Sequence, residues 1–181
     1  LLSASNIVHE FPDGQEMVRV LSGCGISVRE NKWTAITGAS GSGKTTLLHI
    51  LAGLVEPTQG EVVYLDQVLS TMSSRELMQF RSSSLGFVYQ SQHFINELSV
   101  LQNVKLPLNI KKDPNPKEKA VQLLQSLDIT EHLMHSRPET LSGGERSRVG
   151  LARAFVHQPN IVLADEPTAS LDHALTHKVF E

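Results

Sequence analysis

A glycine-rich segment in the first third of the chain constrains its fold most. The segment reads Gly38-Ala39-Ser40-Gly41-Ser42-Gly43-Lys44-Thr45-Thr46. An apolar run at 33–37 precedes it and a leucine-rich run at 47–54 follows it, so the pattern predicts a buried strand, a glycine loop and a helix. Glycines let successive N–H groups face one anion, and a helix start adds unpaired donors and the positive end of its dipole. The segment therefore predicts a phosphate-binding loop.

Two side chains at the end of this segment suit a nucleoside triphosphate. Lys44 supplies a point charge for the outer phosphates, and the Thr45 hydroxyl suits Mg²⁺. The alternative is an ordinary glycine turn before a helix. Gly, Gly, Lys and Ser/Thr at these offsets arise by chance in only about one chain in a hundred of this length. The sequence therefore predicts nucleotide binding.

A second candidate site follows an apolar run at 161–164, where Asp165 and Glu166 end a predicted buried strand. Such a strand delivers carboxylates to the carboxyl edge of an open α/β sheet, where ligands bind. Asp165 suits Mg²⁺, and Glu166 suits a base that accepts a proton from, or orients, an attacking water. The alternative is a solvated acidic turn, which is less favoured here because a phosphate loop occurs earlier in the same chain.

A third candidate site is the segment Leu141-Ser142-Gly143-Gly144-Glu145. Its N–H groups at a helix start form a potential second anion site. Ser142 followed three residues later by Glu145 is also the pattern of a capping box, which is purely structural. Local physics does not separate these two interpretations, and both can hold.

The remaining pattern predicts an α/β fold. Short runs between turns at 3–30 indicate antiparallel strands, and Ser73 or Ser74 suits the cap of a helix that reaches Arg81. Apolar runs at 85–89 and 161–164 alternate with helical patterns, which favours a parallel sheet. No strand is expected at 91–142, so this stretch predicts an inserted helical subdomain.

Composition removes several classes of function. The net charge is −3, so a broad electrostatic surface for nucleic acid is not expected. A single cysteine, Cys24, allows no intrachain disulfide, and no apolar run approaches the length of a membrane span. The chain starts without Met and stops at Glu181 in a helical pattern, so we expect the C-terminal part of the domain to be missing.

The ordered motifs resemble those of the ABC-type ATPases over essentially the whole chain. The matching segments are Gly38 to Thr45, Gln90, Leu141 to Glu145, Asp165-Glu166 and Ala169-Ser170-Leu171-Asp172. Within this family, residues 87–90, 98–104 and 145–148 look most similar to the ATPases of lipoprotein-release and macrolide-export systems. The resemblance implies a P-loop NTPase with a mostly parallel sheet, an N-terminal antiparallel β layer and an inserted helical subdomain. It implies one domain over 1–181, with a core at 1–90 and 143–181 and the helical subdomain at 91–142.

The resemblance also implies ATP hydrolysis that powers a membrane transporter. The ATPase would be a head-to-tail dimer in which Ser142, Gly143, Gly144 and Glu145 reach ATP held by the other copy. Asp172 would lie at the dimer contact. The helical segment after Gln90 would dock on a transmembrane permease, which places the chain at the cytoplasmic face of the membrane.

Individual roles follow from the same resemblance. Lys44 and Glu166 would act in catalysis with Gln90, which would meet Mg²⁺ and the attacking water. Phe11 corresponds by position to the aromatic residue that stacks on adenine, although a buried strand phenylalanine is an equal alternative. The family's switch histidine would lie beyond Glu181.

Two other classes of function remain open at this point. One is a soluble ABC-type ATPase of DNA repair or translation, which the negative charge disfavours. The other is a subunit that couples ATP to a membrane partner for signalling or scaffolding without transport, which nothing in the sequence separates from transport.

Overall fold

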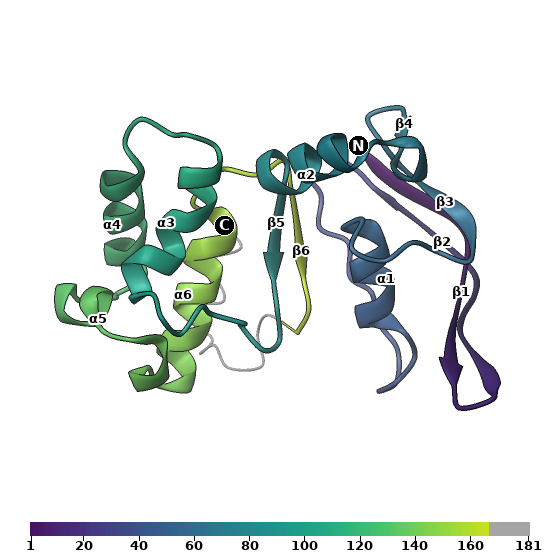
Figure 1. Ribbon diagram of the computed structural model, residues 1–181, viewed down its shortest axis with the longest axis horizontal. Coiled ribbons are helices and arrows are strands. Elements are labelled where there is room, and N and C mark those ends of the chain that lie inside the picture. Colours follow the sequence, from purple (N-terminus) through teal and green to yellow (C-terminus); the bar gives the residue numbers. More distant parts are fainter. Residues whose placement is uncertain (167–181) are drawn as a thin grey trace. The chain divides into compact units, whose positions relative to one another are not determined.

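The computed structural model describes residues 1–166, which divide into two compact units. The first unit comprises Leu1–Arg81, and the second begins at Ser82. Figure 1 labels their helices and strands. Each unit has its own sheet and its own helices, and they are described in turn.

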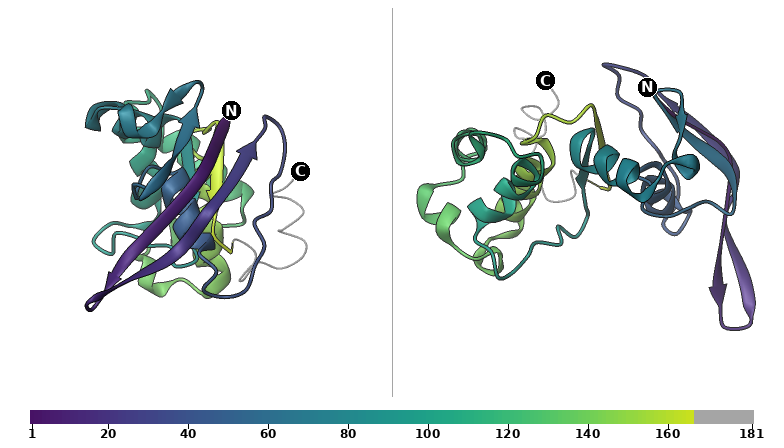
Figure 2. Two further views of the ribbon diagram at one scale, coloured as in Figure 1. Left: turned by 90° about the vertical axis from the view of Figure 1, so that its right-hand side faces the viewer. Right: turned by 45° about the horizontal axis from the view of Figure 1, so that its top comes forward.

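The first unit contains a four-stranded sheet of order β2-β1-β3-β4 in which all neighbours are antiparallel. The strands are β1 (Leu2–Asp13), β2 (Glu16–Val28), β3 (Gln59–Tyr64) and β4 (Gln67–Val68). The antiparallel N-terminal layer is confirmed, as two long strands in place of several short ones. Because β3 pairs with β1 only as far as Val8, the far end of the β1–β2 hairpin extends beyond β3 (Figure 2).

Helix α1 (Lys44–Leu51) and all but the last two residues of α2 (Ser74–Ser83) complete the first unit. Helix α1 buries its leucine-rich side, and Gly53 ends it with a left-handed φ of 63°. Helix α2 follows a 3₁₀ turn, η1 (Leu69–Thr71). Glu76 Oε2 accepts hydrogen bonds from Ser73 N and Oγ, each 2.7 Å long, so Ser73 is the predicted cap.

The predicted buried strand at 33–37 is wrong. This stretch has no strand structure, and Trp33 is 69% exposed. A strand needs a hydrogen-bonded neighbour. The sheet of the first unit ends on this side at β2, so the backbone at 33–37 has no strand beside it there. An apolar run is typical of a buried strand, but composition does not supply a partner strand.

The second unit is built on a parallel pair, β5 (Leu85–Val88) and β6 (Ile161–Ala164), with helices around it. The helices are α3 (Val100–Ile110), α4 (Pro116–Ser126), α5 (Glu131–His135), the 3₁₀ turn η2 (Pro138–Thr140) and α6 (Gly143–Phe155). The sheet lies close to α6, since a Cβ built on Gly86 would overlap the Ala154 carbonyl. Both the parallel pairing and the helical stretch between the strands are confirmed.

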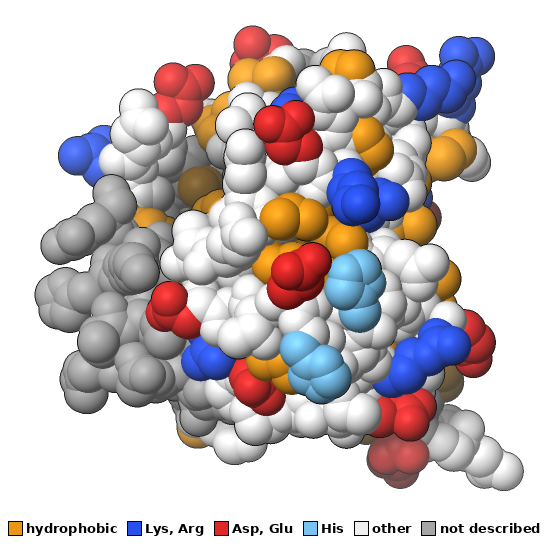
Figure 3. All heavy atoms as spheres, turned by 90° about the vertical axis from the view of Figure 1, so that its left-hand side faces the viewer, with side chains coloured by type: hydrophobic (Ala, Val, Ile, Leu, Met, Phe, Trp, Pro, Cys, Tyr) orange, Lys and Arg blue, Asp and Glu red, His pale blue; other side chains and the backbone are white. Residues whose placement is uncertain are grey.

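One core holds these helices together. Its fully buried members include Val100, Val104, Ala120, Leu124 and Val149, from α3, α4 and α6. On the face shown in Figure 3, hydrophobic side chains are interspersed with acidic, basic and histidine side chains. Across residues 1–166, no helix combines the length and the apolar character needed to cross a membrane.

Candidate functional site

The phosphate loop owes its shape to two glycines in the left-handed region. Gly41 has a φ of 77° and Gly43 a φ of 90°, which L side chains rarely adopt. A Cβ on Gly43 would also lie 2.8 Å from Leu21 Cδ2 and 3.0 Å from Val20 O, on strand β2. Glycine is therefore required at 43 for both conformation and space.

Lys44 is the first residue of α1, and its side chain turns back along the loop. Its Nζ donates to Gly38 O at 3.0 Å and to Ala39 O at 2.9 Å. The N-cap of α1 is Gly43, which offers no side-chain cap, and the first turn contains no acidic residue. An ammonium group beside uncapped helix donors is an arrangement that suits an anion.

Phe11 lies in the part of β1 that pairs only with β2, opposite Val18. Its side chain is 41% exposed, so the alternative of a buried strand phenylalanine does not hold. The Phe11 ring meets the buried His9 ring edge to face, with centroids 4.4 Å apart. One aromatic surface is thus held in place while part of it faces solvent.

The acidic segment begins where β6 ends. Asp165 is 8% exposed, and its N–H donates to Val88 O at 2.9 Å. Glu166 is exposed and has a φ of 48°. Gln90 Nε2 donates to Glu166 Oε2 at 2.7 Å. The structure therefore brings together two predicted residues that are 76 positions apart in the chain.

The predicted capping box at the start of α6 is present. Glu145 N donates to Ser142 Oγ at 3.3 Å, while Glu145 Oε2 accepts from Ser142 N at 2.8 Å and Oγ at 2.7 Å. The hydrogen bond from Ser142 Oγ lowers the pKa of the Glu145 carboxylate most, and the one from Ser142 N lowers it further. Ser142 and Gly143 are exposed at this end of the helix. The cap is thus formed by residues that still face solvent.

The structure adds three residues that the sequence did not single out. Gln92 is 8% exposed, and its carboxamide lies against Gly150 of α6. Arg153, one turn further along α6, donates to the backbone carbonyls of Gln92 and His93. The sequence offered one signal for this contact, namely Gly150 in the middle of an amphipathic helix. A glycine there weakens the helix, so its presence suggests close packing against a neighbour.

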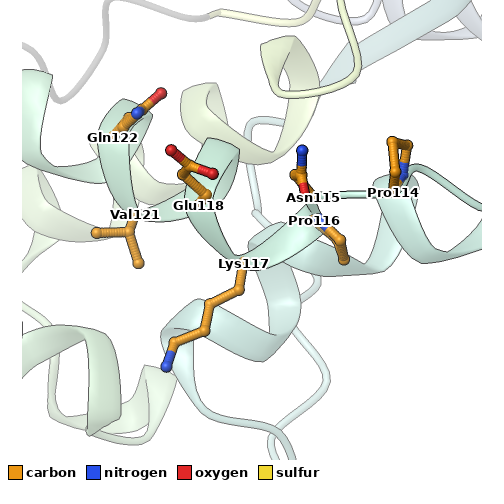
Figure 4. A pocket seen from close by; sticks show the side chains of 7 residues that line it. All are labelled: Pro114, Asn115, Pro116, Lys117, Glu118, Val121 and Gln122. Atoms are coloured by element: carbon orange, nitrogen blue, oxygen red, sulfur yellow. The ribbon is translucent and has the colours of Figure 1, made fainter.

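The lysines around 111–119 do not form a continuous basic patch. Lys111 Nζ donates to His157 O at 3.0 Å, and Lys119 forms an ion pair with Asp113 at 2.6 Å. A depression lies at the start of α4, and its lining residues are Pro114, Asn115, Pro116, Lys117, Glu118, Val121 and Gln122. In Figure 4, the Lys117 side chain extends away from the Glu118 carboxylate. The arrangement favours a solvated surface over a basic binding patch.

Within residues 1–166, no group of three or more His, Cys, Asp or Glu side chains forms a metal site. His132 and His135 lie on the short helix α5 without a third ligand of this kind. Asp172, the rest of the segment at 169–172 and the histidines at 173 and 177 lie outside the described residues.

Comparison with known proteins gives a consistent result. Residues 21–169 match the ABC transporter family. The chain is 42% identical to the lipoprotein-releasing system ATP-binding protein LolD of Idiomarina loihiensis, over its whole length and 80% of the relative. It is 44% identical to LolD of Acinetobacter baylyi, with the same coverage.

Solved structures agree with these relatives. A dimeric structure of the ATP-binding cassette MJ0796 in a post-hydrolysis state, bound to ADP and Pi, has a TM-score of 0.91 and 33% identity. A second dimeric structure of MJ0796, described as a bacterial ABC transporter cassette, has a TM-score of 0.92. Each match covers 99% of this chain and 79% of the solved chain. The chain therefore belongs to the ABC transporter family, as an ATP-binding and ATP-hydrolysing subunit of the LolD group.

Proposed function

We propose that Glu166 is the general base for ATP hydrolysis and that Gln90 orients it and the attacking water. The hydrogen bond between Gln90 Nε2 and Glu166 Oε2 carries this proposal. A carboxylate that shares a donor with a water can accept the proton that the water loses on attack. Since phosphoryl transfer depends mostly on positioning and charge neutralisation, one such base is sufficient beside a phosphate site and a metal ion.

The phosphate loop and Phe11 supply the other contacts to ATP in this proposal. The contacts come from the backbone of residues 38–46, the Lys44 ammonium and the ring of Phe11, which would stack on adenine. Mg²⁺ would be held by oxygens of Thr45, Gln90 and Asp165, a donor set that suits a hard cation. The position of Asp165 directly after β6 supports this role, because ligands of open α/β sheets bind at the carboxyl ends of the strands. Mg²⁺ supplies charge neutralisation at the phosphates.

The active unit would be a head-to-tail dimer. Ser142, Gly143 and Gly144 would contact ATP bound by the second copy, and Asp172 would lie at the contact. Two observations support this arrangement. Ser142 and Gly143 are exposed at the positive end of α6, and the similar cassette MJ0796 is dimeric in both structures.

The membrane partner would be a transmembrane permease, and the chain would bind it at the cytoplasmic face of the membrane. The contact would be made by the helical subdomain at 91–142, which is inserted in the single domain over 1–181. The relatives named as ATP-binding proteins of a lipoprotein-releasing system support lipoproteins as the cargo class. Co-purification of the full-length protein with its membrane partner tests this. A partner without a transport path would favour signalling, and salt-sensitive DNA binding would favour a soluble repair ATPase.

The substitution Glu166→Gln tests the catalytic proposal. Glutamine keeps the size of the side chain but cannot accept the proton, so turnover should fall about 10²–10⁴-fold while ATP binding persists. Sizing of the full-length variant in ATP and Mg²⁺ should show a trapped dimer. Glu139→Gln, at an exposed acid on η2, is the matched control and should behave as wild type. A monomeric Glu166→Gln variant with intact hydrolysis would refute the proposal.

A further inference from the structure

Helix α6 contains a glycine at a position where helix propensity favours alanine. Gly150 is buried, and its surroundings explain the choice. A Cβ built there would overlap the Gln92 side chain and lie 2.9 Å from its Nε2 atom. The missing methyl group therefore makes room for one particular carboxamide, which comes from the loop after β5.

Gln92 is also held from two further directions. Its Nε2 donates to Tyr89 O at 2.7 Å, which closes the loop between these residues. Its backbone carbonyl accepts from Arg153 Nη2, and the neighbouring His93 carbonyl accepts from Nη1 at 3.2 Å. The guanidinium group lies 4.8 Å from the centre of the Phe94 ring. A planar group with several donors is suited to bridge two carbonyls in this way.

The held loop is the one that presents Gln90, two residues before Gln92. Gln90 donates to Glu166, so a shift of the loop changes the hydrogen bond to the proposed base. Helix α6 contacts the loop through Gly150 and Arg153, and its first turn carries Gly143 and the capping box. One helix thus connects the Gln90 loop with the segment Leu141 to Glu145, here called the signature segment.

We propose that Gln92, Gly150 and Arg153 form a positioning contact, the Gln92 contact, that holds Gln90 on Glu166 and couples this pair to α6. None of the three residues touches the reacting atoms. They fix the loop, so that a movement of the signature segment, such as closure on a second copy, changes the position of Gln90. This inference rests on the proposed roles of Gln90 and Glu166.

The substitution Gly150→Ala is the primary test, made in the full-length protein. The added methyl group displaces the Gln92 side chain and with it the loop. A misplacement of about 1 Å at a catalytic group costs about 10²-fold in rate, so we expect kcat to fall by that factor. The dissociation constant for ATP, measured without Mg²⁺ and therefore without turnover, should change less than about twofold, because Lys44 and the phosphate loop lie on other elements.

The double variant Gln92→Ala/Gly150→Ala separates a steric effect from general damage. Removal of the carboxamide makes room for the methyl group, so kcat should rise at least about tenfold above Gly150→Ala. Gln92→Ala alone should lose about threefold, since Arg153 still holds the backbone. Gln122→Ala, on the exposed side of α4, is the matched glutamine control. A double variant no faster than Gly150→Ala would overturn the inference.

The substitution Arg153→Lys tests the same contact without any change at position 150. Lysine keeps the charge but cannot bridge both carbonyls, so kcat should fall about tenfold with ATP affinity unchanged. Wild-type kcat in this variant would overturn the inference. If Glu166→Gln kept full turnover, the proposed function itself would fail, and this outcome is distinct from both results above.

Discussion

Two helices of this chain, α1 and α6, have glycines at their starts, yet their first turns differ. Helix α1 has Gly43 at its N-cap, with no side-chain cap and no acid in the first turn. Helix α6 has Ser142 at its N-cap and Glu145 three residues later, joined by reciprocal hydrogen bonds. The orphan N–H groups of α1 are thus left without a side-chain cap, whereas those of α6 are partly satisfied.

The difference shows that a glycine-containing helix start suits two different roles in anion binding. An uncapped start beside the Lys44 ammonium is suited to hold a highly charged anion by itself. A capped start already carries a carboxylate, so it is suited to complete a site whose charge is balanced elsewhere. This agrees with the proposal that α1 holds the phosphates and that α6 closes over ATP of a second copy.

The largest expected effect is at α1. Lys44→Ala removes the point charge and leaves the phosphates with backbone donors alone, which should weaken ATP binding about 10²-fold. Calorimetric titration measures this. Ser142→Ala should leave the ATP affinity of a single copy unchanged, and Lys117→Ala on α4 is the matched lysine control. Equal losses in Lys44→Ala and Ser142→Ala would contradict the division of roles.

Gly43 and Gly143 lie at the starts of α1 and α6, and alanine should affect them differently. Gly43→Ala forces a φ of 90° on a side chain that also overlaps Leu21, so it should destabilise the first unit by about 1–3 kcal/mol. Gly143→Ala meets open space, so thermal unfolding should change little. Its turnover should nevertheless fall, because the methyl group would face the second copy in the proposed dimer. Unchanged turnover in Gly143→Ala would argue against a site shared between copies.

The cap of α6 gives a smaller effect. Ser142→Ala removes the cap and should lower the free energy of unfolding by about 1 kcal/mol, as measured by denaturant titration. Gly43→Ser would place a serine at the corresponding position of α1. There the strained φ outweighs any gain from capping, so that variant should not be stabilised. A stabilised Gly43→Ser variant would show that α1 lacks a cap for no structural reason.

The smallest expected effect is the pH dependence of the α6 cap. The pKa of Glu145 is lowered in the folded state, so its contribution to stability is present above its unfolded pKa and is lost as pH falls through its folded pKa. Glu145→Gln should therefore differ from wild type in melting temperature near neutral pH and converge with it in acid, below the folded pKa. Helix α1 has no acid in its first turn and contributes nothing comparable. A constant difference across this pH range would contradict the assignment.

The features that sequence predicted well are local ones. The caps at Ser73 and Ser142 depend on a residue and its partner three positions later, and both are present. The loop glycines were predictable because left-handed φ values demand them. The resemblance to a family predicted catalytic roles for both Gln90 and Glu166, but the hydrogen bond between them was not predicted, since no local rule links residues so far apart.

The features that sequence did not predict depend on neighbours from distant segments. The stretch at 33–37 has a strand-like composition but no strand beside it in the sheet of its unit. Gln92 and Arg153 are unremarkable by composition, and their contact exists only because the loop after β5 meets α6. Gly150 offered the one local clue, as a break in helix propensity whose reason became visible in three dimensions.

The hydrogen bonds of Lys44 to the carbonyls of Gly38 and Ala39 have a thermodynamic consequence for ligand choice. A phosphate bound by this ammonium would replace these hydrogen bonds instead of adding to them. The net gain in binding free energy then depends on how much more strongly the ammonium interacts with the phosphate charge than with two carbonyl dipoles. The exchange favours a triphosphate strongly, a monophosphate weakly and a neutral nucleoside not at all. The loop should thus select ligands by charge density, even without any contact to the nucleobase. We therefore expect AMP to compete only slightly with ATP at equal concentrations.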